Sequence, residues 1–128
     1  MNLESRVAKT QKSPEELYNF LTQVENFKHL LPEDAKFEIL GEDKFLFGLK
    51  GMPEIKLGLK DSKPHTQVIL GSLGDKMSFT LTANIEPDPD GAAAQLFFNG
   101  DFNAMMAMMI KGPINKFLDQ LATGIENL

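Results

Sequence analysis

The side chains that could carry out acid–base chemistry are few and lie far apart in this sequence. Histidine is the usual proton carrier near neutral pH, and the chain contains only His29 and His65. His29 follows Lys28 in a predicted short helix and His65 follows Pro64 in a predicted turn, so we expect both rings at the surface. Neither histidine has a short metal-binding spacing, and there is no cysteine. We therefore predict no metal site and no thiolate nucleophile.

Two carboxylates are the remaining candidates for a general base. Asp61 shares the alternation of Leu57 and Leu59, which predicts that it faces inward, and Asp101 stands next to Phe102 near the expected mouth of a cavity. A carboxylate in apolar surroundings can accept a proton. Both positions fall near strand ends that water can reach, and the sequence has no nucleophile elbow and no phosphate- or dinucleotide-binding loop. We predict no catalytic residue and no cofactor, and we favour a non-enzymatic role.

The charged residues argue against a nucleic-acid site. The net charge is −5 and Arg6 is the only arginine, although arginine is the side chain best suited to phosphates and base edges. Five lysines gather in the middle of the chain: Lys44, Lys50, Lys56, Lys60 and Lys63. We interpret them as solvated positions that protect sheet edges. Contact with an anionic partner or a lipid headgroup is the alternative.

Length and composition predict one soluble domain over residues 1–128. Hydrophobic residues make up 42% of the chain and charged residues 24%, as in ordinary globular proteins. The first residues lack the apolar core of a signal peptide, and no run approaches the ~20 apolar residues of a membrane span. We expect a cytoplasmic protein.

Local patterns predict the first elements. The alternation at the start of the chain predicts a half-buried strand, with Leu3, Ser5 and Val7 on its inner face and Glu4, Arg6 and Ala8 on the other. Ser13-Pro14-Glu15-Glu16 predicts a helix start with an N-cap serine, a proline at the first helical position and a capping box. A second short helix is expected from about Val24 to Leu31, and Pro32 ends it.

Strands and a terminal helix follow. Residues 35–102 alternate between strand and turn patterns, and Gly51-Met52-Pro53-Glu54 breaks one of them. The clearest strand has apolar residues at every second position: Met77, Phe79, Leu81, Ala83 and Ile85. Asn103 is the predicted N-cap of a helix from Ala104 to Leu128, which Gly112-Pro113 is expected to interrupt. The result is an α+β domain whose last helix covers the apolar face of the sheet.

This order of elements resembles the START-like (SRPBCC) superfamily. The local match is best in Glu4-Ser5-Arg6-Val7, in the helix Ser13–Leu21 and in Val24-Glu25-Asn26-Phe27. Members include the birch-pollen-allergen type, polyketide cyclases and coenzyme-Q-binding proteins. The resemblance implies a helix-grip fold: a curved antiparallel sheet of about six to seven strands, two short helices after strand 1 and a long C-terminal helix over the sheet.

The resemblance also implies an apolar cavity between the sheet and the last helix. We therefore expect a binding or carrier module for a small hydrophobic ligand, such as a lipid, a fatty acid, an isoprenoid or a polyketide-like molecule. Two alternatives remain: a cyclase or dehydratase in the same cavity, and a protein-interaction module of the Hsp90-activator kind. The expected cavity wall consists of Phe45, Phe47, Leu57, Leu59, Leu70, Phe79, Leu81, Leu96, Phe98, Met106, Ile110, Ile114 and Phe117.

The start of the last helix is unusually rich in methionine. At about 100° per residue, the apolar stripe of this helix comprises Ile110, Ile114, Phe117, Leu118, Leu121, Ile125 and Leu128. Met105, Met108 and Met109 fall on nearly the opposite side, and only Met106 approaches the stripe. A kink at Pro113 could turn them onto the core. We favour the alternative that they stay exposed as a ligand gate, a membrane-touching lip or a homodimer contact.

Overall fold

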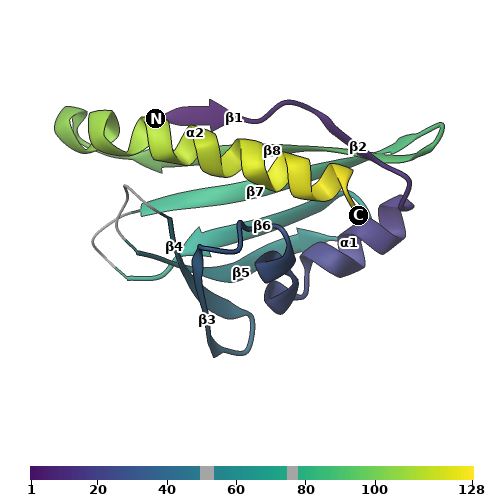
Figure 1. Ribbon diagram of the computed structural model, residues 1–128, viewed down its shortest axis with the longest axis horizontal. Coiled ribbons are helices and arrows are strands. Elements are labelled where there is room, and N and C mark those ends of the chain that lie inside the picture. Colours follow the sequence, from purple (N-terminus) through teal and green to yellow (C-terminus); the bar gives the residue numbers. More distant parts are fainter. Residues whose placement is uncertain (50–53, 75–77) are drawn as a thin grey trace.

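Eight strands of the described chain form one antiparallel sheet, and a long helix crosses one face of it (Figure 1). The computed structural model describes residues 1–49, 54–74 and 78–128. The strands are β1 (Asn2–Glu4), β2 (Ala8–Thr10), β3 (Lys36–Gly41), β4 (Lys44–Gly48), β5 (Ile55–Lys63), β6 (Gln67–Ser72), β7 (Ser78–Asp88) and β8 (Gly91–Asp101). The helices are α1 (Pro14–Leu21), the 3-10 helix η1 (Val24–His29) and α2 (Ala104–Glu126).

The strands follow the order β1-β8-β7-β6-β5-β4-β3, and β2 also pairs with β8. This confirms the predicted α+β architecture, in which the C-terminal helix packs on an antiparallel sheet. Three features that the sequence singled out lie outside the described residues, namely Lys50, the break at Gly51-Met52-Pro53 and the strand position of Met77.

The predicted first strand is divided in two. Ser5 lies between β1 and β2 and is buried, and its hydroxyl accepts a hydrogen bond of 3.0 Å from the backbone N–H of Leu96. The alternation shifts after this point, so Ala8 is buried while Val7 is 51% exposed. The inward position predicted for Val7 is therefore wrong, because the ladder with β8 is interrupted between Glu4 and Ala8.

Helix α1 begins as its sequence predicts. The backbone N–H of Glu16 donates to the Ser13 hydroxyl, and the Glu16 carboxylate accepts from the backbone N–H of Ser13, each over 3.1 Å. The hydrogen bond from the Ser13 backbone N–H is the main cause that lowers the pKa of Glu16, and the bond to the Ser13 side chain adds to it. The second short helix is the 3-10 helix η1, which buries Val24 and Phe27.

Helix α2 runs without interruption, with Pro113 inside it, so the interruption predicted at Gly112-Pro113 is wrong. A proline removes a single backbone donor, and the neighbouring turns supply the remaining hydrogen bonds. The Asn103 side chain caps the helix by accepting a 2.8 Å hydrogen bond from the backbone N–H of Met106. The face of α2 toward the sheet buries Ile110, Ile114, Phe117, Leu118, Leu121 and Ile125.

A β-bulge in β5 reverses which face its second half presents. Leu59 pairs with Leu70 and Asp61 pairs with Ile69, so Lys60 is the extra residue. Because side chains alternate between the faces of a strand, one extra residue moves Asp61 from the inner to the outer face. The prediction that Asp61 faces inward is therefore wrong, and its side chain is exposed.

Candidate functional site

The residues predicted to line a cavity meet between α2 and the inner face of the sheet. Most of them are buried: Phe45, Phe47, Leu57, Leu70, Phe79, Leu81, Leu96, Phe98, Ile110, Ile114 and Phe117. Leu59 and Met106 are partly buried against this cluster. Phe45 and Phe47 both point inward from β4. Their role as a ligand wall stays a prediction.

Aromatic rings fill much of this interior. The rings of Phe47 and Phe117 stack with their centroids 4.4 Å apart, and Phe45 stacks on Phe27 at 5.3 Å. Between α2 and the sheet, the described residues, among them Phe27, Leu70 and Leu121, enclose a cavity of about 10 Å³. Such a space holds about one water molecule, for which ~10–15 Å³ is needed, whereas small-molecule pockets reach roughly 300–1,000 Å³. A ligand could enter only if α2 or the sheet moved.

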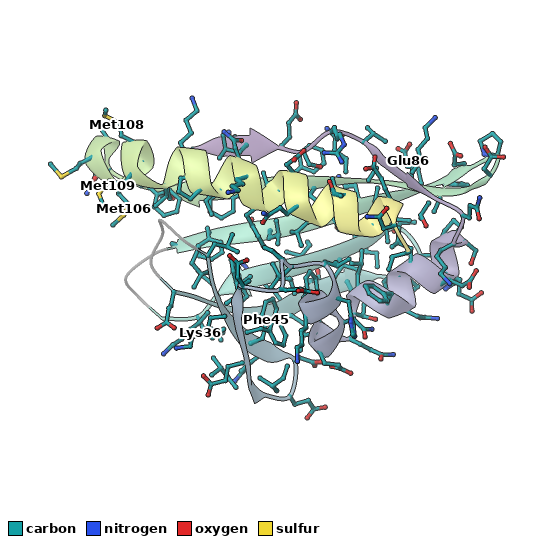
Figure 2. The ribbon with its side chains drawn as sticks, in the orientation of Figure 1. Lys36, Phe45, Glu86, Met106, Met108 and Met109 are labelled. Carbon is teal, nitrogen blue, oxygen red and sulfur yellow. The ribbon has the colours of Figure 1, made fainter. Side chains whose placement is uncertain are left out.

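The methionine cluster, by which we mean Met105, Met108 and Met109, lies at the surface. These side chains are 75%, 83% and 64% exposed, while Met106 packs partly against the core. The first turns of α2 extend past the end of β7, and Figure 2 shows Met108 and Met109 projecting from them. The alternative in which a kink turns these methionines onto the core is therefore wrong. A role as gate or contact stays a prediction.

The candidate acid–base residues do not form a shielded site. His29, His65, Asp61 and Asp101 are all exposed. The ring of His65 makes an edge contact with Tyr18, with centroids 5.6 Å apart. Within the described residues, no group of three or more histidine, aspartate or glutamate side chains could hold a metal ion. The same part of the chain has no helix long and apolar enough to cross a membrane.

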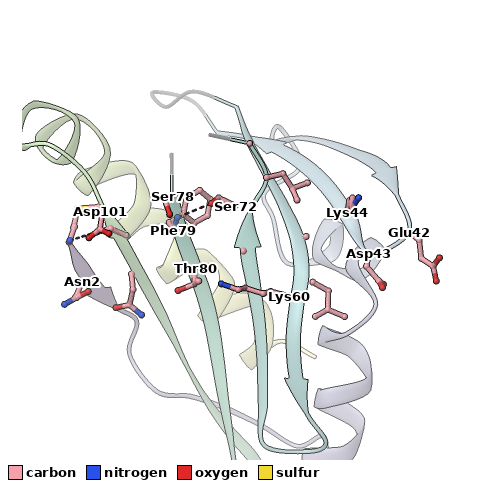
Figure 3. Close-up of a pocket in the computed structure, with 18 residues that line it drawn as sticks. Asn2, Glu42, Asp43, Lys44, Lys60, Ser72, Ser78, Phe79, Thr80 and Asp101 are labelled. Atoms are coloured by element: carbon pink, nitrogen blue, oxygen red, sulfur yellow. Dashed lines mark hydrogen bonds between the residues drawn. The ribbon is translucent and has the colours of Figure 1, made fainter. Parts of the chain in front are cut away.

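A polar groove of about 930 Å³ crosses the face of the sheet opposite α2 (Figure 3). Its floor is a row of directly paired residues from six strands: Lys44, Gly58, Gly71, Thr80, Asn99 and Asn2. Gly58 and Gly71 have no side chains, so the middle of this row is bare backbone. Lys60, the bulge residue, lies over Gly71, with its Cδ 3.2 Å from the place a Cβ would occupy there.

The groove has charges of both signs and does not suit an apolar ligand. Glu42, Asp43 and Lys44 lie at one end of the groove and Asp101 lies toward the other, with Lys60 between them (Figure 3). We did not predict this groove. The sequence does contain a signal for it, because Gly58 and Gly71 each place a glycine on the polar face of a predicted strand, and these two strands follow one another in the chain.

The described lysines of the middle strands are exposed: Lys44, Lys56, Lys60 and Lys63. Both strands that carry them, β4 and β5, are paired on each side. The interpretation of these lysines as edge protection is therefore wrong, because β3 and not β4 forms that edge of the sheet.

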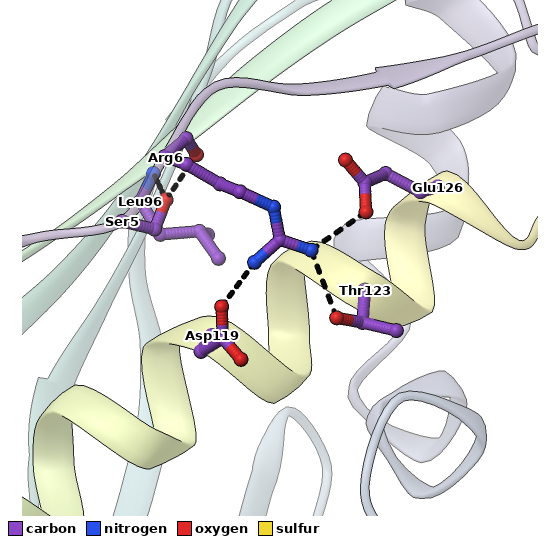
Figure 4. Close-up of polar contacts among 6 residues, drawn as sticks. All are labelled: Ser5, Arg6, Leu96, Asp119, Thr123 and Glu126. Carbon is purple, nitrogen blue, oxygen red and sulfur yellow. Dashed lines mark hydrogen bonds and ion pairs between the residues drawn. The ribbon is translucent and has the colours of Figure 1, made fainter.

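Polar contacts outside the core help to hold α2 over the interior (Figure 4). The Arg6 guanidinium, from the segment between β1 and β2, forms ion pairs with Asp119 and Glu126 of α2. It also donates a 2.9 Å hydrogen bond to the Thr123 hydroxyl. The hydrogen bond to Glu126 is the main cause that raises the pKa of Arg6, and Asp119 adds to it. Arg6 thus joins the segment between β1 and β2 to the second half of α2.

Comparisons with known proteins identify the fold. No protein-family model matches this chain, and no curated protein matches it. Among solved structures, protein Ms6760 from Mycobacterium smegmatis has a TM-score of 0.75 at 7% identity, over 98% of this chain and 88% of that chain. Protein CV1439 from Chromobacterium violaceum has a TM-score of 0.67 at 18% identity, over 98% and 97%.

A third similar structure is the solution structure of the Aha1 dimer from Colwellia psychrerythraea. It has a TM-score of 0.60 at 16% identity, over 97% of this chain and 98% of that chain. Identities this low carry information about the fold alone. The chain has a helix-grip-like α+β fold.

Proposed function

We propose that this protein is an interaction module of the START-like kind, whose contact surface is the methionine cluster and whose first partner is a second copy of the chain. The observation that carries the proposal is the exposure of Met105, Met108 and Met109 at 75%, 83% and 64%. Large apolar side chains that cluster at a surface commonly mark a contact site. Methionine suits such a site because its flexible thioether side chain adapts to the partner.

Two further observations support this choice over a ligand carrier. The recorded interior cavity of about 10 Å³ leaves little room for a guest molecule. A protein of similar fold, the Aha1 protein from Colwellia psychrerythraea, was solved as a dimer. The enzymatic alternative gains no support, because the described candidate acids and bases are all exposed and separate elements carry them.

The solution mass of matched variants tests the proposal. Met105, Met108 and Met109 are replaced together by glutamine in one variant and by leucine in the other. Methionine, glutamine and leucine have similar helix propensities, so both variants should retain α2. We expect sedimentation velocity to show a concentration-dependent dimer for the wild type and the leucine variant and a monomer for the glutamine variant. A wild type that stays monomeric, or a glutamine variant that still dimerises, would contradict the proposal.

A carrier of a small hydrophobic ligand is the second candidate. It is favoured by the apolar lining of the space between α2 and the sheet, which includes Leu70, Leu81, Leu96 and Leu121. Binding would require that space to open, with the methionine cluster as the gate. Native mass spectrometry of protein purified from its own host tests this candidate. A co-purified apolar molecule would support the carrier, and its reproducible absence would count against it.

A further inference from the structure

The methionine cluster has ligand chemistry beyond its apolar surface. Four of the seven methionines of the chain occupy positions 105, 106, 108 and 109. The thioether sulfur of methionine is a soft ligand that suits Cu(I). Zinc and iron–sulfur clusters, which also take sulfur ligands, are typically held by cysteine thiolates. The chain has no cysteine that would compete for such an ion.

The helical spacing brings three thioethers to one face. Residues three and four apart on a helix have Cβ atoms about 5–6 Å from each other, and Met105 stands in this relation to both Met108 and Met109. Each side chain is long and flexible, so three sulfur atoms can converge on one ion. The exposure of 64% or more at each position leaves them free to reorient.

The turn that carries these residues is held in place. The Asn103 side chain accepts a 2.8 Å hydrogen bond from the Met106 N–H, and the Asn103 carbonyl accepts one of 2.9 Å from the Ala107 N–H. Met106 also packs partly against the core. The backbone of the site is therefore already in its helical arrangement before any ion arrives.

Local charge favours a monovalent soft ion over a divalent hard one. The first turn of α2 contains no acidic residue, whereas Ca²⁺ and Mg²⁺ require oxygen ligands. The partial positive charge at a helix N-terminus opposes any cation, and it opposes a divalent cation more strongly. A neutral set of three thioethers with a singly charged ion keeps this cost low.

We propose that Met105, Met108 and Met109 form a three-thioether binding site for Cu(I). The site uses the same residues as the proposed interaction surface but does not depend on that function. Sulfur is needed for the metal, while only apolar surface is needed for self-association. Leucine at the three positions removes the first property and keeps the second.

Competition for Cu(I) against a chromophoric chelator under anaerobic conditions tests the site. We expect the wild type to withdraw Cu(I) from the chelator and the triple leucine variant to lose this ability. In ¹³C-methyl-methionine NMR spectra of the wild type, the signals of the three cluster methionines should shift on addition of Cu(I). A His29→Gln/His65→Gln double variant is the matched control, because histidine is also a copper ligand and both of these rings are exposed, and it should retain binding.

Two outcomes would overturn the metal site. One is a wild type that competes no better than the triple leucine variant, and the other is loss of binding in the histidine control. If the triple variant does not fold, Met108→Leu alone suffices, because this side chain is 83% exposed and its loss should weaken Cu(I) binding. A monomeric protein that binds Cu(I) would contradict the self-association while supporting the metal site.

Discussion

At the scale of single residues, a few polar side chains fix where elements begin and how they are joined. Ser13 and Glu16 satisfy each other's backbone donors at the start of α1. Arg6 connects the first strands to the last turns of α2. Each of these contacts is exposed, so its effect should depend on solution conditions.

The capping box should make the stability of the fold sensitive to acid. The pKa of Glu16 is lowered in the folded state from its ordinary value of 4.5. Its ionised form therefore stabilises the fold above the unfolded-state pKa, and this contribution is lost as the pH falls through the folded-state pKa. When the pH is lowered from 7 to below 4.5, the free energy of unfolding should fall less for Glu16→Gln than for the wild type. Urea denaturation at both pH values measures this difference.

Glu15→Gln is the matched control for this acid effect. Glu15 lies in the same turn but is not the residue that closes the capping box. If both variants lost stability with the same pH dependence as the wild type, the cap would have no electrostatic effect.

The Arg6 contacts should depend on ionic strength. Surface ion pairs are weakened by salt, and the Arg6 side chain is 42% exposed. We expect Arg6→Gln to lower the melting temperature at low salt and to lower it less at molar salt. Thermal denaturation by circular dichroism at both salt concentrations measures the difference. If the decrease in melting temperature were the same at both salt concentrations, it would come from lost packing of the aliphatic part of the Arg6 side chain and not from the ion pairs.

At the scale of elements, α2 approaches the end of η1 closely at Gly124. A Cβ added at Gly124 would lie 2.8 Å from the Cδ2 and 3.0 Å from the Cα of Leu30. Because one of these atoms belongs to the backbone, rotation of a side chain alone cannot relieve the overlap. Glycine at this position therefore allows the last helix to pack on the short helical segment.

Substitution of two glycines in α2 tests this contact. We expect Gly124→Ala to destabilise the fold by about 1–3 kcal/mol through overpacking. Gly112→Ala is the matched control, because no atom beyond its chain neighbours and the backbone of its own helix lies within 4 Å of the added Cβ. The following Pro113 opposes the gain in helix propensity, since a proline ring crowds the Cβ of the residue before it. We therefore expect a change smaller than about 1 kcal/mol. Chemical denaturation measures both values. Equal effects of the two substitutions would show that helix propensity and not packing decides.

At the scale of the whole molecule, aromatic rings pack the interior both between the helix and the sheet and between neighbouring strands. Phe117 of α2 is 2% exposed and stacks on Phe47 of β4. Phe79 of β7, 6% exposed, stacks on Phe98 of β8. These contacts explain why the helix and the sheet enclose so little free volume.

Removal of one ring tests whether the interior is packed or open. We expect Phe117→Ala to cost about 3–5 kcal/mol, since the site cannot collapse fully around the missing ring. Phe20→Ala, at a partly buried position, is the matched control and should cost less. Denaturant titrations of both variants measure the difference. A cost for Phe117→Ala as low as that of the control would indicate that Phe117 borders a cavity that opens in solution.

Much of the candidate site follows from local pattern, because helical phase is a property of consecutive residues. The phase of residues 104–128 separates a buried stripe from Met105, Met108 and Met109, and the structure exposes these three methionines. The helical phase does not predict whether Pro113 breaks the helix. The structure keeps α2 continuous through Pro113, because packing on the sheet stabilises the turns on both sides.

Elements with local signals can be placed from the order of residues alone. These are the capped start of α1, the buried stripe of α2 and the inward alternation of β7 from Phe79 to Ile85. The face on which Asp61 lies depends on strand pairing, since the bulge at Lys60 arises from the register of β5 on β6. The polar groove likewise requires the registers of six strands at once. The volume left inside depends on how all core side chains fill one space, which no single segment specifies.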